Sequence, residues 1–178
     1  MIKVMKSYFE IIVPLDVNAD WLKGLREDLS DVGMRWQNGF FHITVAFIKS
    51  SDNIDLITSI INNHLLTFQN VFRIKLNKLD AFPISNGRTY ITHLGATEIP
   101  IEFSRWIKDL RNKLEDLNID LEPDFKLHVT IGRISSEVID LETLQYRLNK
   151  HEAPNIDLET KHFEYREFRG VTIKKWDF

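Results

Sequence analysis

The sequence contains no cysteine. This absence excludes disulfide bonds, thiolate metal sites and catalysis by a cysteine nucleophile. The sequence also has no long apolar run near its start, because Lys6 and Glu10 interrupt the apolar residues of the segment 1–15. We therefore expect neither a signal peptide nor a membrane span, and we expect a cytoplasmic protein that does not bind a membrane.

Positive charge is not in excess. The 178 residues include 23 Lys and Arg against 26 Asp and Glu, which gives a formal net charge of −3. Proteins that hold long nucleic acids through many phosphate contacts usually carry a basic surplus, because the release of counterions drives that binding. A short substrate or a single nucleic-acid end needs only a few local cations.

The chain also lacks low-complexity segments and linkers, so a single domain over residues 1–178 is expected. Apolar, β-prone segments predict strands over 8–15, 40–48, 71–79, 88–94, 126–134, 156–165 and 169–176. The dipeptide Asn86-Gly87 predicts a turn between two of these strands. Helices are predicted from Asn18 or Asp20 to Gly33, from Asp52 to Leu65, from Pro100 to Asn118 and from Val138 to Leu148.

One short pattern occurs twice, once in each half of the chain. His42-Ile43-Thr44 and His128-Val129-Thr130 each lie in an apolar predicted strand that is followed by a helix. This repetition predicts an α+β fold with two pseudo-symmetric lobes of mainly antiparallel sheet, helices on the outside and a cleft between the lobes. Side chains alternate along a strand, so each motif offers an imidazole and a hydroxyl on the same face.

Two imidazoles and two hydroxyls in one cleft meet the needs of in-line phosphodiester cleavage. One neutral imidazole takes a proton from the attacking group, and one protonated imidazole gives a proton to the departing oxygen. Histidine is the side chain most readily present in both forms near neutral pH. The hydroxyls of Thr44 and Thr130 can donate to the phosphate oxygens, and this scheme requires no metal and no cofactor.

A structural interpretation competes with this one. A single His-x-Ser/Thr pattern arises easily by chance, and half-buried strand histidines often make purely structural hydrogen bonds. Two copies at equivalent places of two half-chains favour the catalytic interpretation.

The paired motifs His42-Ile43-Thr44-Val45 and His128-Val129-Thr130-Ile131 resemble the signature of the two-histidine (2H) phosphoesterase superfamily. The likeness is greatest to its LigT-like branch of 2′-5′ RNA ligases and cyclic phosphodiesterases, and it extends over nearly the whole chain. The resemblance implies that His42 and His128 act as general acid and base, and that Thr44 and Thr130 hold the phosphate without a metal.

Other residues are weaker candidates for the site. Arg133 is a candidate phosphate ligand, although strict alternation places it on the face opposite to His128. Phe9, Phe82 and Phe125 are candidates for stacking on a base, with ordinary packing as the alternative. Phe47 is out of phase with His42 and is predicted to belong to the core. The basic residues Arg166, Arg169, Lys174 and Lys175 either guide a phosphate-rich substrate or form a solvated strand edge.

The sequence therefore predicts a phosphodiesterase that acts on 2′,3′-cyclic phosphates or 2′-5′ linkages of RNA ends or small nucleotides. No obligate protein partner is expected, and the expected state is a monomer. Two alternatives remain open at this stage. One is a catalytically idle module that binds RNA ends or nucleotides, and the other is a 2′-5′ RNA ligase, since the same acid and base serve both directions of the reaction.

Overall fold

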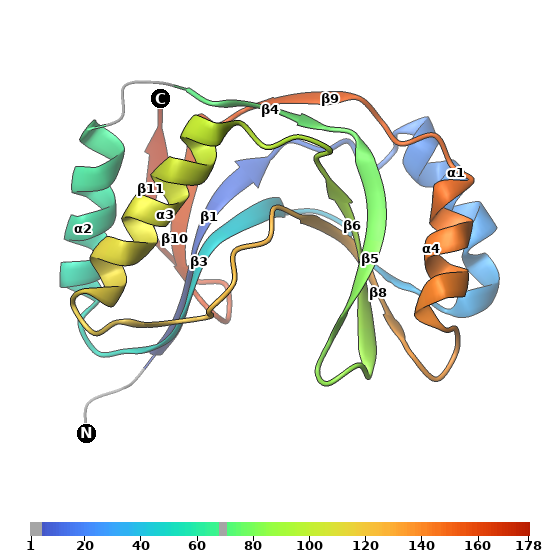
Figure 1. The fold of residues 1–178 in the computed structure, drawn as a ribbon, viewed down its shortest axis with the longest axis horizontal. Helices are drawn as coiled ribbons and strands as arrows, with labels where there is room; N and C mark the ends of the chain where they lie inside the picture. The colour runs from blue at the N-terminus through green and yellow to red at the C-terminus, as the bar shows by residue number, and fades with distance from the viewer. Residues whose placement is uncertain (1–4, 68–70) are drawn as a thin grey trace.

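The protein forms an arch, with one pair of helices at each end and a bent sheet between them (Figure 1). The computed structural model describes residues 5–67 and 71–178. Residues 1–4, the start of the segment in which no signal peptide is expected, lie outside the described residues. None of the helices in the described ranges is both long and apolar enough to cross a membrane.

A large antiparallel sheet forms the arch, and in the described residues it contains nine strands. Seven of these follow one another in the order β11-β10-β1-β3-β8-β6-β5. Their bounds are Met5–Val13 for β1, Phe41–Ser51 for β3, Lys78–Ile84 for β5, Thr89–Gly95 for β6, Val129–Ser135 for β8, His162–Glu167 for β10 and Thr172–Asp177 for β11. The two-residue strands β2 (Arg35–Trp36) and β7 (Asp120–Leu121), which the sequence did not predict, pair with β8 and β3.

The helices follow the predicted apolar spacing. Their bounds are Asp20–Asp28 for α1, Ile54–Thr67 for α2, Ile101–Glu115 for α3 and Leu141–Asn149 for α4. Asp140 caps α4 by accepting a hydrogen bond from the Thr143 N–H. The helix α1 begins at Asp20 as predicted, but neither Asn18 nor Asp20 caps it, because Ala19 occupies the cap position and no side chain bonds to the first turn. A short 3₁₀ turn follows α1 and ends at Gly33, whose φ of 62° suits a residue without Cβ.

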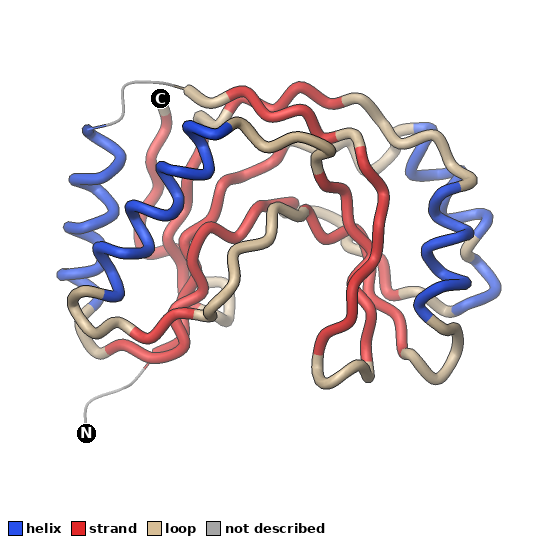
Figure 2. The backbone as a smooth tube through the Cα atoms, in the orientation of Figure 1, coloured by secondary structure: helices blue, strands red, loops and turns tan. Residues whose placement is uncertain are grey.

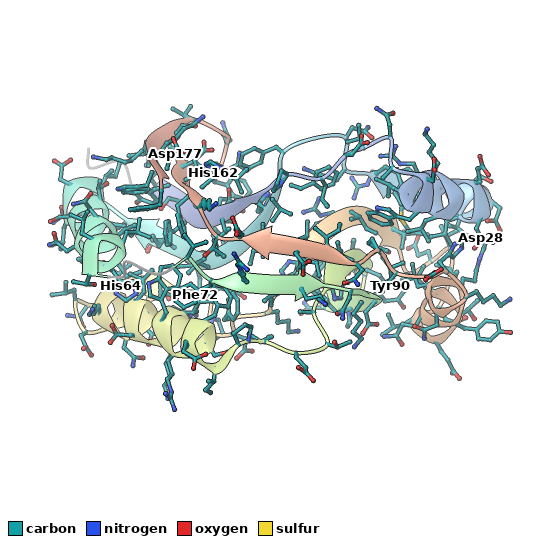
Figure 3. The ribbon with its side chains drawn as sticks, turned by 90° about the horizontal axis from the view of Figure 1, so that it is seen from above. Asp28, His64, Phe72, Tyr90, His162 and Asp177 are labelled. Carbon is teal, nitrogen blue, oxygen red and sulfur yellow. The ribbon has the colours of Figure 1, made fainter. Side chains whose placement is uncertain are left out.

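Two predicted strands are each divided between two sheets. The segment 71–79 forms β4 (Arg73–Leu76) and the start of β5, and the segment 156–165 forms β9 (Ile156–Glu159) and the start of β10. The strands β4 and β9 pair with each other in a separate two-stranded sheet. Seen from above, this small sheet runs between the two ends of the arch (Figure 3). Two of the chain's passages between the ends, from α2 to β5 and from α4 to β10, therefore run through it.

The two halves of the large sheet meet at one pair of residues. Among the described residues, β3 and β8 pair only through Ile43 and Val129, whose side chains are fully buried. On one side of this pair, β3 pairs with β1, which pairs with β10. On the other side, β8 pairs with β6, which pairs with β5. The predicted α+β fold with two related lobes is thus confirmed, and the lobes share one continuous sheet.

Candidate active site

The two motifs lie side by side at the junction of the half-sheets. Because Ile43 and Val129 are opposed in antiparallel strands, the register places His42 beside Thr130 and Thr44 beside His128. Ile43 and Val129 point into the core, so all four polar side chains lie on the opposite face of the sheet. This arrangement is the one that the sequence predicted from the spacing of the motifs.

Each motif histidine is oriented in the same way by its own chain. The His42 Nδ1 lies 3.2 Å from the Phe40 carbonyl oxygen, and the His128 Nδ1 lies 2.9 Å from the Lys126 carbonyl oxygen. A carbonyl can only accept a hydrogen bond, so Nδ1 carries the hydrogen in both rings. The Nε2 atoms are therefore left to exchange protons with a ligand.

Burial lowers the pKa of both motif histidines. The pKa of His42 falls to about 4 because the ring is largely removed from water, and Arg166, His128 and Arg133 lower it further. The pKa of His128 is lowered by burial first and then by Lys126 and Arg133. Positively charged side chains near both rings thus add to the effect of burial and disfavour protonation.

A cleft of about 500 Å³ opens on this face. Thr44 and His128, one residue from each motif, line it together with Tyr8, Phe82 and Lys126. The remaining motif residues, His42 and Thr130, are not among its lining residues, although they lie next to Thr44 and His128 in the sheet. The loop 122–128, drawn as a tan tube before β8 in Figure 2, forms one wall of the cleft.

Of the three phenylalanines predicted to stack on a base, only Phe82 lines the cleft. Its ring lies edge-on to His128 with the centroids 5.1 Å apart, and Lys126 Nζ lies 4.7 Å from its centroid. Phe125 is not among the lining residues and packs against the core residue Phe103. The prediction for Phe9 is wrong, because Phe9 is fully buried against the rings of Phe163 and Trp176.

Bulges in β3 and β8 change which residues face the cleft. The register slips by one residue between Thr44 and Ala46 in β3, and between Thr130 and Gly132 in β8. Each slip inserts one extra residue just after the motif threonine, which reverses the alternation beyond it. Phe47 and Arg133 therefore share the face of the histidines.

These bulges settle two predictions about faces. Phe47 was predicted to be a core residue, and this is wrong because its half-buried ring lines the cleft and stacks on Tyr8 at 4.7 Å. Arg133 lies on the histidine face, close enough to lower the pKa of both motif histidines. It remains exposed and is not among the residues that line the cleft.

Two residues of this face, Glu10 and His93, were not predicted from the sequence. Glu10 is fully buried beside the first motif, with Oε1 3.2 Å from His42 Nε2. Its Oε2 lies 2.9 Å from Nε of Arg166, which the sequence predicted to guide a substrate or to lie at a solvated strand edge, without a link to the first motif. His93 lies beside the second motif, with its ring centroid 5.9 Å from that of His128. A glutamate inside the apolar run of residues 8–15 was the one signal that could have identified Glu10.

No cluster of three or more His, Cys, Asp or Glu side chains in the described part of the chain is arranged to hold a metal ion.

Comparison with solved structures extends over almost the whole chain. LigT of E. coli in complex with NADP+ superposes with a TM-score of 0.68 at 16% identity, covering 99% of both chains. Usb1 of Kluyveromyces marxianus with uridine monophosphate superposes with a TM-score of 0.70 at 9% identity, covering 97% of this chain and 98% of that one. A structure described as a phosphoesterase gives 0.65 at 17% identity, covering 99% of both chains.

No family model matches the sequence, and no curated protein matches it. The chain therefore resembles these proteins in structure, while its sequence is only 9% to 17% identical to theirs. The fold that the two motifs predicted is confirmed: this chain has the α+β fold of E. coli LigT.

Proposed function

We propose that this protein is a phosphodiesterase that cleaves 2′,3′-cyclic phosphates or 2′-5′ linkages at RNA ends or in small nucleotides. His42 and His128 exchange protons with the attacking and leaving oxygens, and the hydroxyls of Thr44 and Thr130 donate to the phosphate oxygens. The observation that carries the proposal is the Ile43–Val129 pair, which places both His-x-Thr motifs on one face.

The surroundings of the motifs support a nucleotide substrate. The cleft has aromatic side chains on two sides, with Tyr8 and Phe47 on one half-sheet and Phe82 on the other. Aromatic rings of this kind stack on bases. Lys126 and Arg133 supply local positive charge for a phosphate, although the net charge of the chain is negative. The solved structures of LigT with 3′-AMP and of Usb1 with uridine monophosphate show nucleotides bound to proteins of this fold.

The test is turnover of 2′,3′-cyclic nucleotides and short 2′-5′ oligonucleotides by the purified protein in the presence of EDTA. We expect metal-independent hydrolysis that falls by about 10²- to 10⁴-fold in His42→Ala and in His128→Ala. His162→Ala is the matched control, because His162 is exposed and pairs with Asp177 away from the cleft. Absence of turnover on all these substrates, or undiminished turnover in both variants, would contradict the proposal.

A further inference from the structure

The chain carries an aromatic ring on each side of the first motif along β3. Phe47 follows the motif and lines the cleft, whereas Phe40 precedes the motif and is not among the residues that line the cleft. Phe40 is 38% exposed, and its ring centroid lies 5.2 Å from that of His42. A phosphate held at the motifs therefore has an aromatic ring on both sides.

Charged contacts fix the position of the Phe40 ring. Glu10 Oε2 lies 2.9 Å from Arg166 Nε, and the guanidinium carbon of Arg166 lies 4.0 Å from the centre of the Phe40 ring. Glu10 is fully buried and the side chain of Arg166 is only 19% exposed, so the guanidinium has little freedom to move. A cation over an aromatic face attracts the ring. The ring is thus held in one place while it stays open to solvent.

Apolar packing does not explain why Phe40 is held there. Its side chain belongs neither to the hydrophobic core nor to the residues packed against it. Its φ of 50° lies in the left-handed region, which is unfavourable for a bulky side chain. The side-chain amide of Gln37 donates to the carbonyl oxygens of Gly39 and Phe40 and supports this turn. Strained residues of this kind are common at ligand contacts, and an exposed ring suits stacking on a base.

A pair of arginines continues the face of the histidines beyond the second motif. Arg133 in β8 and Arg35 in β2 are directly opposed in antiparallel strands, and the Gln37 N–H donates to the Ile131 carbonyl oxygen beside them. Directly opposed residues share a face, so Arg35 lies on the same face as Arg133. Neither arginine has an ion pair or a hydrogen bond among the described residues.

Arg35 adds positive charge to a group that is otherwise balanced. The buried carboxylates of Glu10 and Glu164 are opposed in the register, and Arg166 and Arg133 balance their two charges. Arg35 lies one strand beyond Arg133, about 5 Å away. Like charges that directly oppose one another are destabilising. An anion bound to Arg35 would therefore stabilise the pair.

We propose that Phe40, Arg35 and Arg133 form a second subsite, which binds the neighbouring nucleotide of an oligonucleotide whose scissile phosphate lies at the motifs. The base of that nucleotide stacks on Phe40, and the phosphate beyond it binds Arg35. Arg133 lies between the motifs and Arg35, and its several N–H donors can reach both phosphates. The inference rests on the phosphodiesterase activity proposed above, and it names short 2′-5′-linked oligonucleotides as the substrate class in preference to cyclic mononucleotides.

Three ligands separate the parts of this subsite. 2′,3′-Cyclic AMP has one base and one phosphate, and 2′-5′ diadenylate adds the second base. The 2′-5′ triadenylate adds a second phosphodiester, whichever of its linkages lies at the motifs. Binding is measured by calorimetry in the His128→Ala background, in which cleavage is suppressed. The dissociation constant should fall from cyclic AMP to the diadenylate and again to the triadenylate.

Arg35→Ala tests the phosphate site. The dissociation constant for the triadenylate should rise about tenfold, and the slope of log K against log salt should shrink by about 0.7, with a smaller effect on the diadenylate. Arg105→Ala, which removes an exposed arginine of α3, is the control and should leave both ligands unaffected. Equal effects of Arg35→Ala on the two ligands, or an unchanged salt dependence, would overturn the assignment of Arg35.

Phe40→Asn tests the base site, because asparagine removes the ring but tolerates a positive φ. The dissociation constants for the diadenylate and the triadenylate should rise about tenfold, and that for cyclic AMP should rise less. Phe40→Tyr keeps a ring and should restore the affinity. Tyr146→Asn is the control, because Tyr146 is an exposed aromatic residue of α4 that also has a cation, Lys150, over its ring.

An equal loss on all three ligands in Phe40→Asn would show that Phe40 acts only through His42, and it would overturn the base site. Phe40→Leu, which also lacks an aromatic face, replaces the asparagine variant if that variant does not fold. A wild type that cleaves none of the three ligands contradicts the proposed function instead. The measured affinities then still decide whether the second subsite exists.

Discussion

Phe47 and Arg133 occupy equivalent places on the two half-sheets. Each lies five residues after a motif histidine, and each is turned onto the histidine face by a bulge that follows the motif threonine. The equivalent places hold unlike side chains, an aromatic ring on one half and a guanidinium on the other. A symmetric framework thereby gives an asymmetric face, with an aromatic ring on one half-sheet and a cation on the other.

Arg133→Ala should weaken substrate binding. A charge-assisted hydrogen bond to phosphate contributes roughly 1.5–3 kcal/mol, so we expect KM for a 2′,3′-cyclic nucleotide to rise by about 10- to 100-fold. Arg105→Ala is the control, because Arg105 is exposed on α3. Steady-state kinetics over a range of ionic strength measures the effect, and an unchanged KM would show that Arg133 does not hold the phosphate.

Phe82→Leu should affect substrate binding, whereas Phe9→Leu should affect the stability of the fold. Phe82 lines the cleft, so its replacement should raise KM several-fold with little change in the unfolding temperature. Phe9 packs in the core against Phe163, so its replacement should lower the free energy of unfolding by about 1–2 kcal/mol and leave KM unchanged. Thermal unfolding and kinetics on the same samples distinguish the two, and a raised KM in Phe9→Leu would refute its placement.

The sequence was sufficient to predict most of the longer elements and the face on which the motif side chains lie. Strand alternation places a histidine and the second residue after it on one face whatever the partner strand is, so His42 and Thr44 could be placed correctly. Alternation fails at a bulge, which depends on pairing with another strand. For this reason Phe47 was assigned to the wrong face and the face of Arg133 could not be decided.

Pairing across the sheet was the information that the sequence did not contain. Glu10 belongs to the site because β1 pairs with β3 on one side and with β10 on the other. Phe9, its neighbour in the chain, points the other way into the core. The segments 71–79 and 156–165 read as continuous strands because apolar and polar residues continue to alternate where the chain passes from one sheet to the other.

Arg111→Met should loosen the loop that orients His128. The buried Arg111 guanidinium donates hydrogen bonds to the carbonyl oxygens of Val45, Glu122 and Pro123. Methionine retains an apolar stem but leaves these carbonyls unpaired, so we expect a loss of roughly 2–4 kcal/mol in the free energy of unfolding. The loop carries Lys126, whose carbonyl accepts from His128 Nδ1, so kcat should also fall about tenfold.

Urea unfolding and steady-state kinetics measure these two effects of Arg111→Met. Lys113→Met is the control, because Lys113 lies on the same helix and is half-exposed in an ion pair with Asp109. A fall in stability without any change in kcat would show that the loop orients His128 without help from Arg111.

His93 should make the protein less stable in acid. Burial lowers the pKa of His93 to about 4, and His128 lowers it further, whereas in the unfolded chain a histidine has a pKa of about 6.5. The folded state therefore disfavours protonation of His93, whereas the unfolded chain accepts that proton below about pH 6.5. The stability that the neutral His93 contributes is thus fully present above pH 6.5 and is lost as the pH falls toward 4. At about 1.4 kcal/mol for each unit, the loss amounts to at most about 3.5 kcal/mol.

Replacement by a side chain that does not titrate isolates this contribution. The free energy of unfolding of His93→Gln should fall less between pH 7.5 and pH 4.5 than that of the wild type, as measured by urea unfolding at both values. His162→Gln is the control, since the exposed His162 pairs with Asp177 on the surface and should leave the acid loss intact. If His93→Gln loses as much stability in acid as the wild type, the proton is taken up elsewhere and the His93 ring is not held neutral by its burial beside His128.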